Sequence, residues 1–158
     1  NFILAYSKSN FLKKNYKILS FGNKNFTERE INFFRDLKII NKISNFSGDH
    51  QKLNDIYSKS SLLVCPSLYE GFGLTPLEAM RYGCPVVTSN IKVFKEVYGN
   101  ASLFFNPKNV EDIKNKMEQL LKSKSLQRKL TIRGYKRIQK YKWSKCAHQT
   151  LDVYKSIN

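Results

Sequence analysis

Short apolar segments alternate with longer helical patterns along most of the chain, and this alternation constrains the fold more than any other feature. Runs rich in Val, Ile, Leu and Phe predict strands at residues 16–21, 42–46, 62–65, 85–88 and 102–105. Apolar residues at helical spacing follow each run. Strands that alternate with helices indicate a parallel sheet covered on both faces. We therefore expect an α/β fold with a doubly wound, Rossmann-like parallel sheet, which binds ligands beyond the carboxyl ends of its strands.

The start of the chain departs from this pattern. Residues 2–6 have a helical pattern, whereas a doubly wound unit begins with a strand, so we expect a further strand upstream. The chain also starts without Met, which favours a fragment of a longer protein. Its 158 residues suit one domain, 1–158. Apolar runs such as 62–65 are far shorter than the roughly 20 residues that a membrane-spanning helix needs.

The chain is strongly basic, with 28 Lys and Arg against 12 Asp and Glu, a net charge of +16. Because 22 of the 28 are Lys, the excess favours compositional bias over a surface that reads nucleic acid, where the forked guanidinium of Arg is preferred. A basic nucleic-acid-binding module stays as the alternative function.

One stretch, 119–151, holds ten basic residues and no acidic one. It is interpreted as a solvated helix face, as a footprint on an anionic membrane surface, or as a nucleic-acid contact. The basic residues are Lys122, Lys124, Arg128, Lys129, Arg133, Lys136, Arg137, Lys140, Lys142 and Lys145.

The cysteines and histidines show no metal or disulfide pattern. Three widely spaced cysteines indicate a reducing, cytoplasmic setting. Cys65 and Cys84 lie in apolar contexts typical of small core residues. His148 is expected to be a surface or partly packed imidazole of the last helix, and no metal site is expected. Trp143 is predicted to anchor the last helix by packing.

The segment 66–80, PSLYEGFGLTPLEAM, carries the candidate chemistry because it follows a strand, contains two glycines and runs into a helix. Thr75 is predicted as the N-cap and Pro76 as the first helical residue. The free N–H groups of residues 74–77 would then point into the crevice and form an anion site suited to a diphosphate.

Two acidic residues bracket this turn. Glu78, three residues after Thr75, is either the carboxylate of a capping box or an acceptor for paired ribose hydroxyls. Glu70 is either a solvated loop charge or a ligand for a hydroxylated substrate. Both interpretations stay open at the level of the residues alone.

Glu70 and Glu78 within EGFGLTPLEAM, followed by GCPVVTS at 83–89, resemble the signature of glycosyltransferase family 4, a retaining family of GT-B fold. Further segments resemble this family and extend the similarity over nearly the whole chain, at 46–48, 53–66, 96–101, 106–107 and 141–144. The resemblance covers only the C-terminal, nucleotide-binding half of such enzymes. It implies that the first strand, an Arg and Lys clamp and the N-terminal acceptor half lie outside this chain.

The resemblance implies roles for individual residues. Glu70 would bind the hydroxyls of the donor sugar and is the candidate catalytic residue. The other candidate donor-binding positions are Gly71, Phe72 and Gly73 around the sugar, Leu74 and Thr75 at the diphosphate, Glu78 at the ribose, and Gly48 and His50 beside the base. Arg81 and Tyr82 replace residues that are often small in the family.

The implied activity is retaining transfer of a hexose from a GDP- or UDP-linked sugar to a glycan or lipid-linked acceptor. Asn1 and Phe2 resemble a form common among mannosyltransferases, which favours GDP-mannose. No cofactor and no metal are expected, since protein groups would hold the charge of the departing diphosphate. The isolated domain is expected to be inactive. The enzyme would be cytoplasmic and peripheral on the inner face of the plasma membrane.

Overall fold

The protein was analysed as a computed structural model, which describes residues 1–22 and 24–157. Strands are found at each of the five predicted places, within two residues of the expected bounds. They are β1 (Ile18–Phe21), β2 (Ile43–Phe46), β3 (Leu63–Cys65), β4 (Val86–Ser89) and β5 (Ser102–Phe105). Branched and aromatic side chains in these short runs suit a pleated, covered surface.

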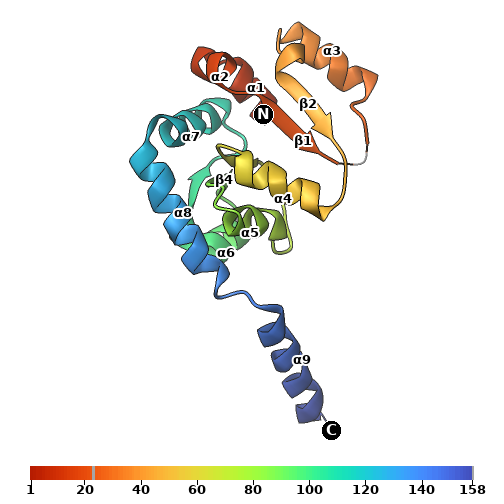
Figure 1. The fold of residues 1–158 in the computed structure, drawn as a ribbon, viewed down its shortest axis with the longest axis vertical. Helices are drawn as coiled ribbons and strands as arrows, with labels where there is room; N and C mark the ends of the chain where they lie inside the picture. Colours follow the sequence, from red (N-terminus) through yellow and green to blue (C-terminus); the bar gives the residue numbers. More distant parts are fainter. Residues whose placement is uncertain (23, 158) are drawn as a thin grey trace.

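Helices separate the strands, as the alternating pattern predicts (Figure 1). The α-helices are α1 (Phe2–Ser7), α2 (Asn10–Asn15), α3 (Glu28–Asp36), α4 (His50–Lys59), α5 (Leu74–Arg81), α6 (Lys92–Tyr98), α7 (Val110–Lys122), α8 (Lys124–Ile138) and α9 (Trp143–Ile157). Two 3₁₀ turns, η1 (Ile40–Lys42) and η2 (Gly99–Ala101), lead into β2 and β5.

Local side chains cap the first turns of α3 and α4. Thr27 and Glu30 form a reciprocal capping box at α3: the Thr27 N–H donates to Glu30 Oε2 at 2.8 Å, and the Glu30 N–H donates to Thr27 Oγ1 at 3.3 Å. At α4 the Asp49 carboxylate accepts from the Lys52 N–H at 2.9 Å. The helix therefore begins at His50.

The strands form two parallel sheets rather than one. β1 pairs with β2, with Ile18 opposite Ile43, and β4 lies between β3 and β5, with Val87 opposite Val64 and Leu103. Among the described residues, no strand pairs with the second edge of β1 or of β3. The domain is thus doubly wound and α/β as predicted, but its sheet is interrupted between β1 and β3.

Helices cover both faces of the sheets, and neighbouring residues of β4 show this directly. Val86 packs in a cluster with α5 and α6, whereas Val87 packs in a second cluster with α1, α2 and α7. Successive strand side chains point to opposite faces, so the two clusters are the two layers of the core. Both valines are fully buried, and each contributes about 1.5–3 kcal/mol of burial free energy.

The last helix, α9, lies apart from the rest of the fold (Figure 1). Trp143, its first residue, is 79% exposed, and no described residue of α9 is buried. The prediction that Trp143 anchors this helix by packing is therefore wrong, because no neighbouring element covers its ring. No helix in the described part of the chain has the length and apolar character needed to cross a membrane.

Candidate functional site

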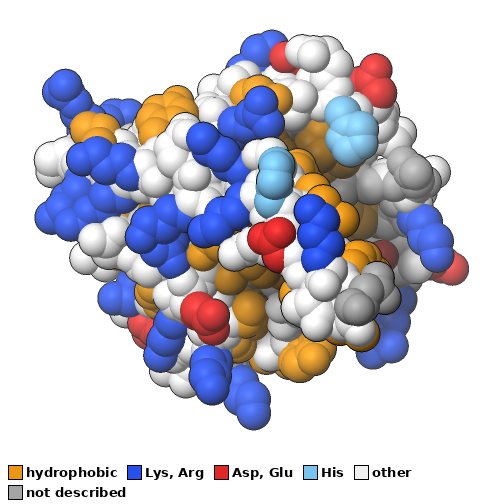
Figure 2. Space-filling view, turned by 90° about the horizontal axis from the view of Figure 1, so that it is seen from below, with side chains coloured by type: hydrophobic (Ala, Val, Ile, Leu, Met, Phe, Trp, Pro, Cys, Tyr) orange, Lys and Arg blue, Asp and Glu red, His pale blue; other side chains and the backbone are white. Residues whose placement is uncertain are grey.

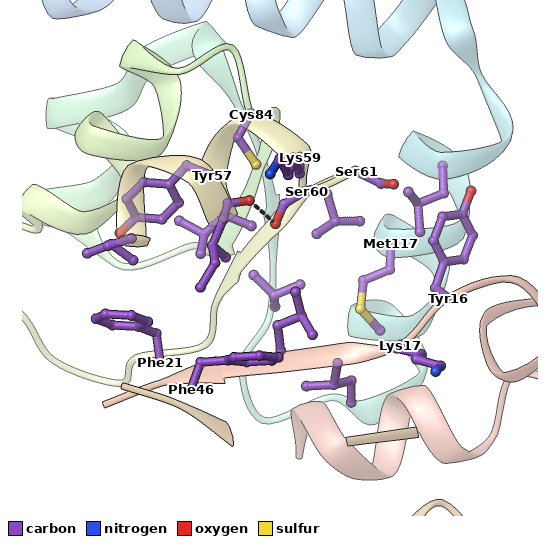
Figure 3. A pocket seen from close by; sticks show the side chains of 18 of the residues that line it. Tyr16, Lys17, Phe21, Phe46, Tyr57, Lys59, Ser60, Ser61, Cys84 and Met117 are labelled. Carbon is purple, nitrogen blue, oxygen red and sulfur yellow. Dashed lines mark hydrogen bonds between the residues drawn. The ribbon is translucent and has the colours of Figure 1, made fainter. Parts of the chain in front are cut away.

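A cavity of about 830 Å³ lies between β1 and β3 and extends along their length. Its walls are mostly apolar. Figure 3 shows Phe21 and Phe46, from the carboxyl ends of β1 and β2, on one side and Tyr57 and Cys84 on the other, with Met117 toward the opposite end. The interruption of the sheet therefore opens a slot that reaches the carboxyl edge, where doubly wound domains bind ligands.

Polar groups gather at the carboxyl end of this cavity. Thr75 and Glu78 reach it from α5, and Lys52 and Tyr57 reach it from α4. The Tyr57 hydroxyl donates to Glu78 Oε2 at 3.5 Å, and its ring stacks on Tyr82 at 6.4 Å between centroids. Burial, together with the negative charge of Glu78, raises the pKa of Tyr57 well above its usual value. The phenol is therefore a hydrogen-bond donor that orients the Glu78 carboxylate.

The loop of residues 66–73, here called the glycine loop, joins β3 to α5 at the same edge. Within it, Ser67 Oγ donates to Glu70 Oε1 at 2.8 Å and lies 3.6 Å from the Sγ of Cys65 at the end of β3. Glu70 is half-buried and lies outside the lining of the main cavity. The loop thus holds one oriented carboxylate beside the cavity, and α5 holds another on its wall.

The start of α5 differs from the prediction. Gly73, with φ 86° and ψ 70°, is the N-cap, and the helix begins at Leu74. Thr75 as N-cap and Pro76 as the first helical residue are therefore wrong by two positions. The physical reason is that glycine adopts a left-handed conformation at little cost. Pro76 at the third helical position is still tolerated, since the first N–H groups of a helix have no partner within it.

This shift also decides one interpretation of Glu78. A capping box requires the acidic residue at the third helical position, whereas Glu78 is the fifth residue of α5. The capping interpretation is therefore wrong, and the carboxylate is exposed on the cavity wall.

The first amides of α5 are available to a ligand. In the described part of the chain, neither the Leu74 N–H nor the Thr75 N–H donates a hydrogen bond to a protein group, and both residues are exposed. These two N–H groups stand at the positive end of the helix dipole. The first two turns of α5 therefore carry two N–H groups that can donate hydrogen bonds to an anion, and the carboxylate of Glu78.

The structure places Gly48 and His50 at the start of α4, where His50 is the first helical residue and is exposed. Neither residue lines the cavity. Lys52, two residues further, does line it: its Nζ donates to the Ser47 carbonyl at 2.7 Å and lies 5.8 Å from the centre of the Phe46 ring. A cation is therefore nearer to the cavity than the imidazole.

Sequence reasoning missed three side chains of this region, Lys52, Tyr57 and Ser67. The sequence predicts Lys52 and Tyr57 only as helical residues, because nothing in it shows which residues of α4 face α5. Ser67 is different. A serine three residues before an acidic residue in a tight loop is a recognisable local pair, because serine hydroxyls bond to nearby groups in turns.

The cysteines behave largely as expected. Cys84 is 2% exposed, and burial raises the pKa of its thiol to about 12. Cys65 is half-buried, and burial raises the pKa of its thiol too. In residues 1–22 and 24–157, no group of three His, Cys, Asp or Glu residues is placed to hold a metal ion.

The fold and this site define a doubly wound domain in which the exposed first amides of a helix lie at the carboxyl edge. The sequence profile of the family described as "Glycosyl transferases group 1" matches residues 1–137. The chain therefore belongs to this glycosyltransferase family, as the resemblance implied.

Similar proteins agree with this assignment. The serotype-specific mannosyltransferase WbdA of Escherichia coli is 41% identical over 99 residues, which are 63% of this chain and 12% of that protein. O-antigen chain mannosyltransferase B of Escherichia coli is 40% identical over 102 residues, 65% of this chain and 27% of that protein. The chain thus spans only a small part of these relatives.

Solved structures share the fold. Sucrose-phosphate synthase from Thermosynechococcus elongatus superposes with a TM-score of 0.83 at 22% identity, over 99% of this chain and 41% of that chain. A glycosyltransferase from Rickettsia africae gives 0.82 at 24% identity, over 98% and 43%. In both comparisons this domain corresponds to less than half of the larger protein.

Proposed function

We propose that the chain is the donor-binding half of a retaining glycosyltransferase, which moves a hexose from a nucleoside diphosphate sugar to a glycan or lipid-linked acceptor. The observation that carries this proposal is the pair of amides at Leu74 and Thr75, which have no partner among the described residues and lie beside Glu78 and the glycine loop with its Glu70. A diphosphate fits the amides because a helix N-terminus favours negative charge. Hydroxyl groups of the sugar and the ribose fit the carboxylates.

The chemistry follows from where charge develops. The bond between the anomeric carbon and the diphosphate oxygen breaks, so the diphosphate gains negative charge. The Leu74 and Thr75 N–H groups stabilise that charge without reorganising, and this lowers the barrier. Glu70 holds the sugar hydroxyls, with Gly71 and Phe72 beside it, and Glu78 holds the ribose.

We propose mannose, delivered as GDP-mannose, as the transferred sugar. Support comes from the mannosyltransferases WbdA and O-antigen chain mannosyltransferase B, which match 63% and 65% of the chain. In this proposal the base lies near the start of α4, at Gly48 and His50, and Lys52 supplies a positive charge close by. Protein groups, with no metal, hold the diphosphate charge.

The test uses the longer protein that contains this domain. It is screened for sugar transfer from GDP-mannose, GDP-fucose, UDP-glucose and UDP-N-acetylglucosamine, and a Glu70→Ala variant is assayed with the best donor. Loss of about 100-fold or more in kcat is expected, as for removal of a group that acts in the transition state. Glu28→Ala, an exposed carboxylate on α3, is the control. Normal transfer by Glu70→Ala would remove Glu70 from the mechanism.

The interrupted sheet supports a second part of the proposal, that an upstream strand completes the domain in the longer protein. β1 and β3 each have one edge to which no described strand pairs, and the cavity lies between these edges. Leu19 of β1 is 47% exposed, and β3 is only half-buried whereas β4 is fully buried. A parallel strand here would give the spatial order 3-2-1-4-5-6 of a dinucleotide-binding fold.

Amide hydrogen exchange tests this strand. In the longer protein, the amides of residues 18–21 and 63–65 are expected to exchange at least tenfold more slowly than in the 158-residue chain, because a paired edge is protected. Residues 86–88 of the central strand β4 are the control and are expected to change little. If residues 18–21 and 63–65 exchanged at the same rates in the longer protein as in the 158-residue chain, the proposal would be contradicted.

We also propose that the basic C-terminal region contacts an anionic membrane surface on the cytoplasmic side. In Figure 2, Lys and Arg side chains gather on the side of the molecule where α8 lies. Two of the ten basic residues are instead used by the fold: Arg133 donates to the Asn100 carbonyl, and Arg137 donates to the carbonyls of Glu96 and Val97. A third, Lys122, pairs with Glu118. The others are free to meet lipid phosphates at about 1 kcal/mol each.

Vesicle sedimentation distinguishes this contact from nucleic-acid binding. Binding to vesicles with 30% phosphatidylserine, lost with pure phosphatidylcholine and weakened by Lys129→Glu and Lys136→Glu, is the expected result. Tight binding to an oligonucleotide with a steep salt dependence, and none to vesicles, would favour the nucleic-acid module instead.

A further inference from the structure

Tyr98, the last residue of α6, contacts the end of the glycine loop. The residue is fully buried, and its hydroxyl donates to the Gly73 carbonyl at 2.7 Å. Its ring packs against Phe94 at 5.0 Å between centroids. We propose that Tyr98 is a positioning residue, whose hydroxyl fixes the peptide unit between Gly73 and Leu74 and so aims the Leu74 N–H at the donor diphosphate. This assignment rests on the proposed function.

The geometry of the peptide unit links the Tyr98 hydroxyl to the direction of the Leu74 N–H. The carbonyl of Gly73 and the N–H of Leu74 belong to one planar, trans unit, so they point in opposite directions. A hydrogen bond that draws the carbonyl toward the core therefore turns the N–H away from the core. Glycine at this position could otherwise rotate through many conformations, because it has no Cβ. The Tyr98 hydroxyl selects one of them.

The packing around Gly73 shows how close this contact is. A Cβ built on Gly73 would lie 2.2 Å from the Tyr98 hydroxyl and 2.6 Å from a ring carbon of Phe94. The backbone is thus seated directly on α6, with space for no side chain. Burial raises the pKa of Tyr98 far above its usual value, with a smaller contribution from the charge of Glu70. The phenol therefore stays protonated and keeps donating.

The preceding loop residue is supported from the same end of α6. Phe72 packs edge-on against Tyr141 at 5.4 Å, with an interplanar angle of 84°. The Tyr141 hydroxyl donates to the Val97 carbonyl at 3.1 Å, and Arg137 Nε donates to the same carbonyl at 2.5 Å. Two adjacent loop residues are therefore held by two adjacent residues of α6, directly at Gly73 and through Tyr141 at Phe72.

The test replaces only the hydroxyl. Tyr98→Phe in the longer protein keeps the ring and its packing, so the domain is expected to fold. The kcat for sugar transfer is expected to fall about tenfold, with KM for the nucleotide sugar within about twofold, since an interaction made mainly in the transition state is weakened. The amides of residues 78–81, which are hydrogen-bonded within α5, are expected to exchange several-fold faster, even without ligand, because the start of the helix is less firmly held.

A matched control removes a similar hydrogen bond elsewhere. Tyr6, in α1, is also buried, and its hydroxyl also donates to a backbone carbonyl, that of Tyr16, at 2.7 Å. Tyr6→Phe is expected to lower the melting temperature about as much as Tyr98→Phe, while leaving kcat and the exchange of residues 78–81 unchanged.

The possible results distinguish a failure of the Tyr98 positioning role from a failure of the proposed sugar transfer. A kcat for Tyr98→Phe within twofold of wild type, or an equal fall in Tyr6→Phe, would overturn the positioning role while sugar transfer itself stands. A wild-type protein that transfers no sugar and binds neither GDP nor UDP would overturn the proposed function. In that event, unchanged exchange of residues 78–81 in Tyr98→Phe would also show that the hydroxyl does not hold the start of α5.

Discussion

Ser67 and Glu70 form a hydrogen bond inside a single loop, with the Ser67 hydroxyl donating to Glu70 Oε1 at 2.8 Å. The loop thereby orients its own carboxylate from Ser67, which lies two residues after the end of β3. Cys65, the last residue of β3, lies 3.6 Å from the same hydroxyl. A rigid strand end therefore determines where the Glu70 carboxylate points.

Ser67→Ala tests this orientation. The variant leaves Glu70 in place but removes its donor, so the carboxylate samples other rotamers. The kcat for sugar transfer is expected to fall about three- to tenfold, which corresponds to the net contribution of one hydrogen bond, about 0.5–1.5 kcal/mol. Steady-state kinetics of the longer protein measure the effect. Ser58→Ala removes a comparable local hydrogen bond on α4, to the Asp55 carbonyl, and is expected to leave kcat unchanged. Equal kinetics for both variants would contradict the role of Ser67.

Gly73→Ala is expected to destabilise the domain by about 2–4 kcal/mol. The alanine would need a left-handed conformation, and its Cβ would overlap the Tyr98 hydroxyl and Phe94, so strain and overpacking add. Gly71→Ala in the same loop is the control, because a Cβ there meets nothing within 4 Å. Urea unfolding should therefore separate the two variants by at least about 1.5 kcal/mol. Equal midpoints would show that the loop does not depend on Gly73.

Much of this fold follows from the sequence alone, because local signals decide its elements. Short branched runs predict all five strands within two residues of their observed bounds. The start of α5 was misplaced for a physical reason: Thr75-Pro76 is a good local start signal, but the left-handed Gly73 begins the helix earlier. Both signals lie in the sequence, whereas the contact of Gly73 with Tyr98, which joins residues 25 positions apart, does not.

The site shows the same division between local and distant contacts. The proximity of Glu70, Glu78 and the amides was predictable, since they lie within nine residues of one another. Tyr57 and Tyr98 act on that segment from 21 and 25 positions away, and their roles depend on how α4 and α6 pack against α5. Trp143 was mispredicted in the opposite sense, because a large apolar residue at helical spacing is usually covered, and here it is not.

Alkaline pH is expected to destabilise the domain through its buried thiol. The pKa of Cys84 in the folded protein is about 12, against about 9 when exposed in the unfolded chain. Below pH 9 both states are protonated and the full stability is present. Between pH 9 and 12 only the unfolded chain ionises, so stability falls as pH rises, by about 1.4 kcal/mol per pH unit from this group.

Urea unfolding between pH 7 and 11 measures this dependence. Cys84→Ala is expected to be less stable at pH 7, because it leaves a small cavity, but to lose stability less steeply above pH 9. Cys146→Ala on the exposed helix α9 is the control, and its slope should match wild type. If Cys84→Ala kept the wild-type slope, the buried thiol would not be the titrating group.

Glu78 is expected to recognise the ribose, and the nucleotide itself can be varied to test this. The wild-type longer protein should bind GDP about 10- to 100-fold more tightly than 2′,3′-dideoxy-GDP, because hydrogen bonds to a charged carboxylate are then lost. In Glu78→Ala the two ligands should bind alike. Tyr57→Phe keeps the carboxylate but removes its 3.5 Å partner, so the preference should shrink only a few-fold. Calorimetric titration gives all six affinities, and their cycle isolates the coupling between Glu78 and the ribose hydroxyls. A preference that survives intact in Glu78→Ala would place the ribose elsewhere.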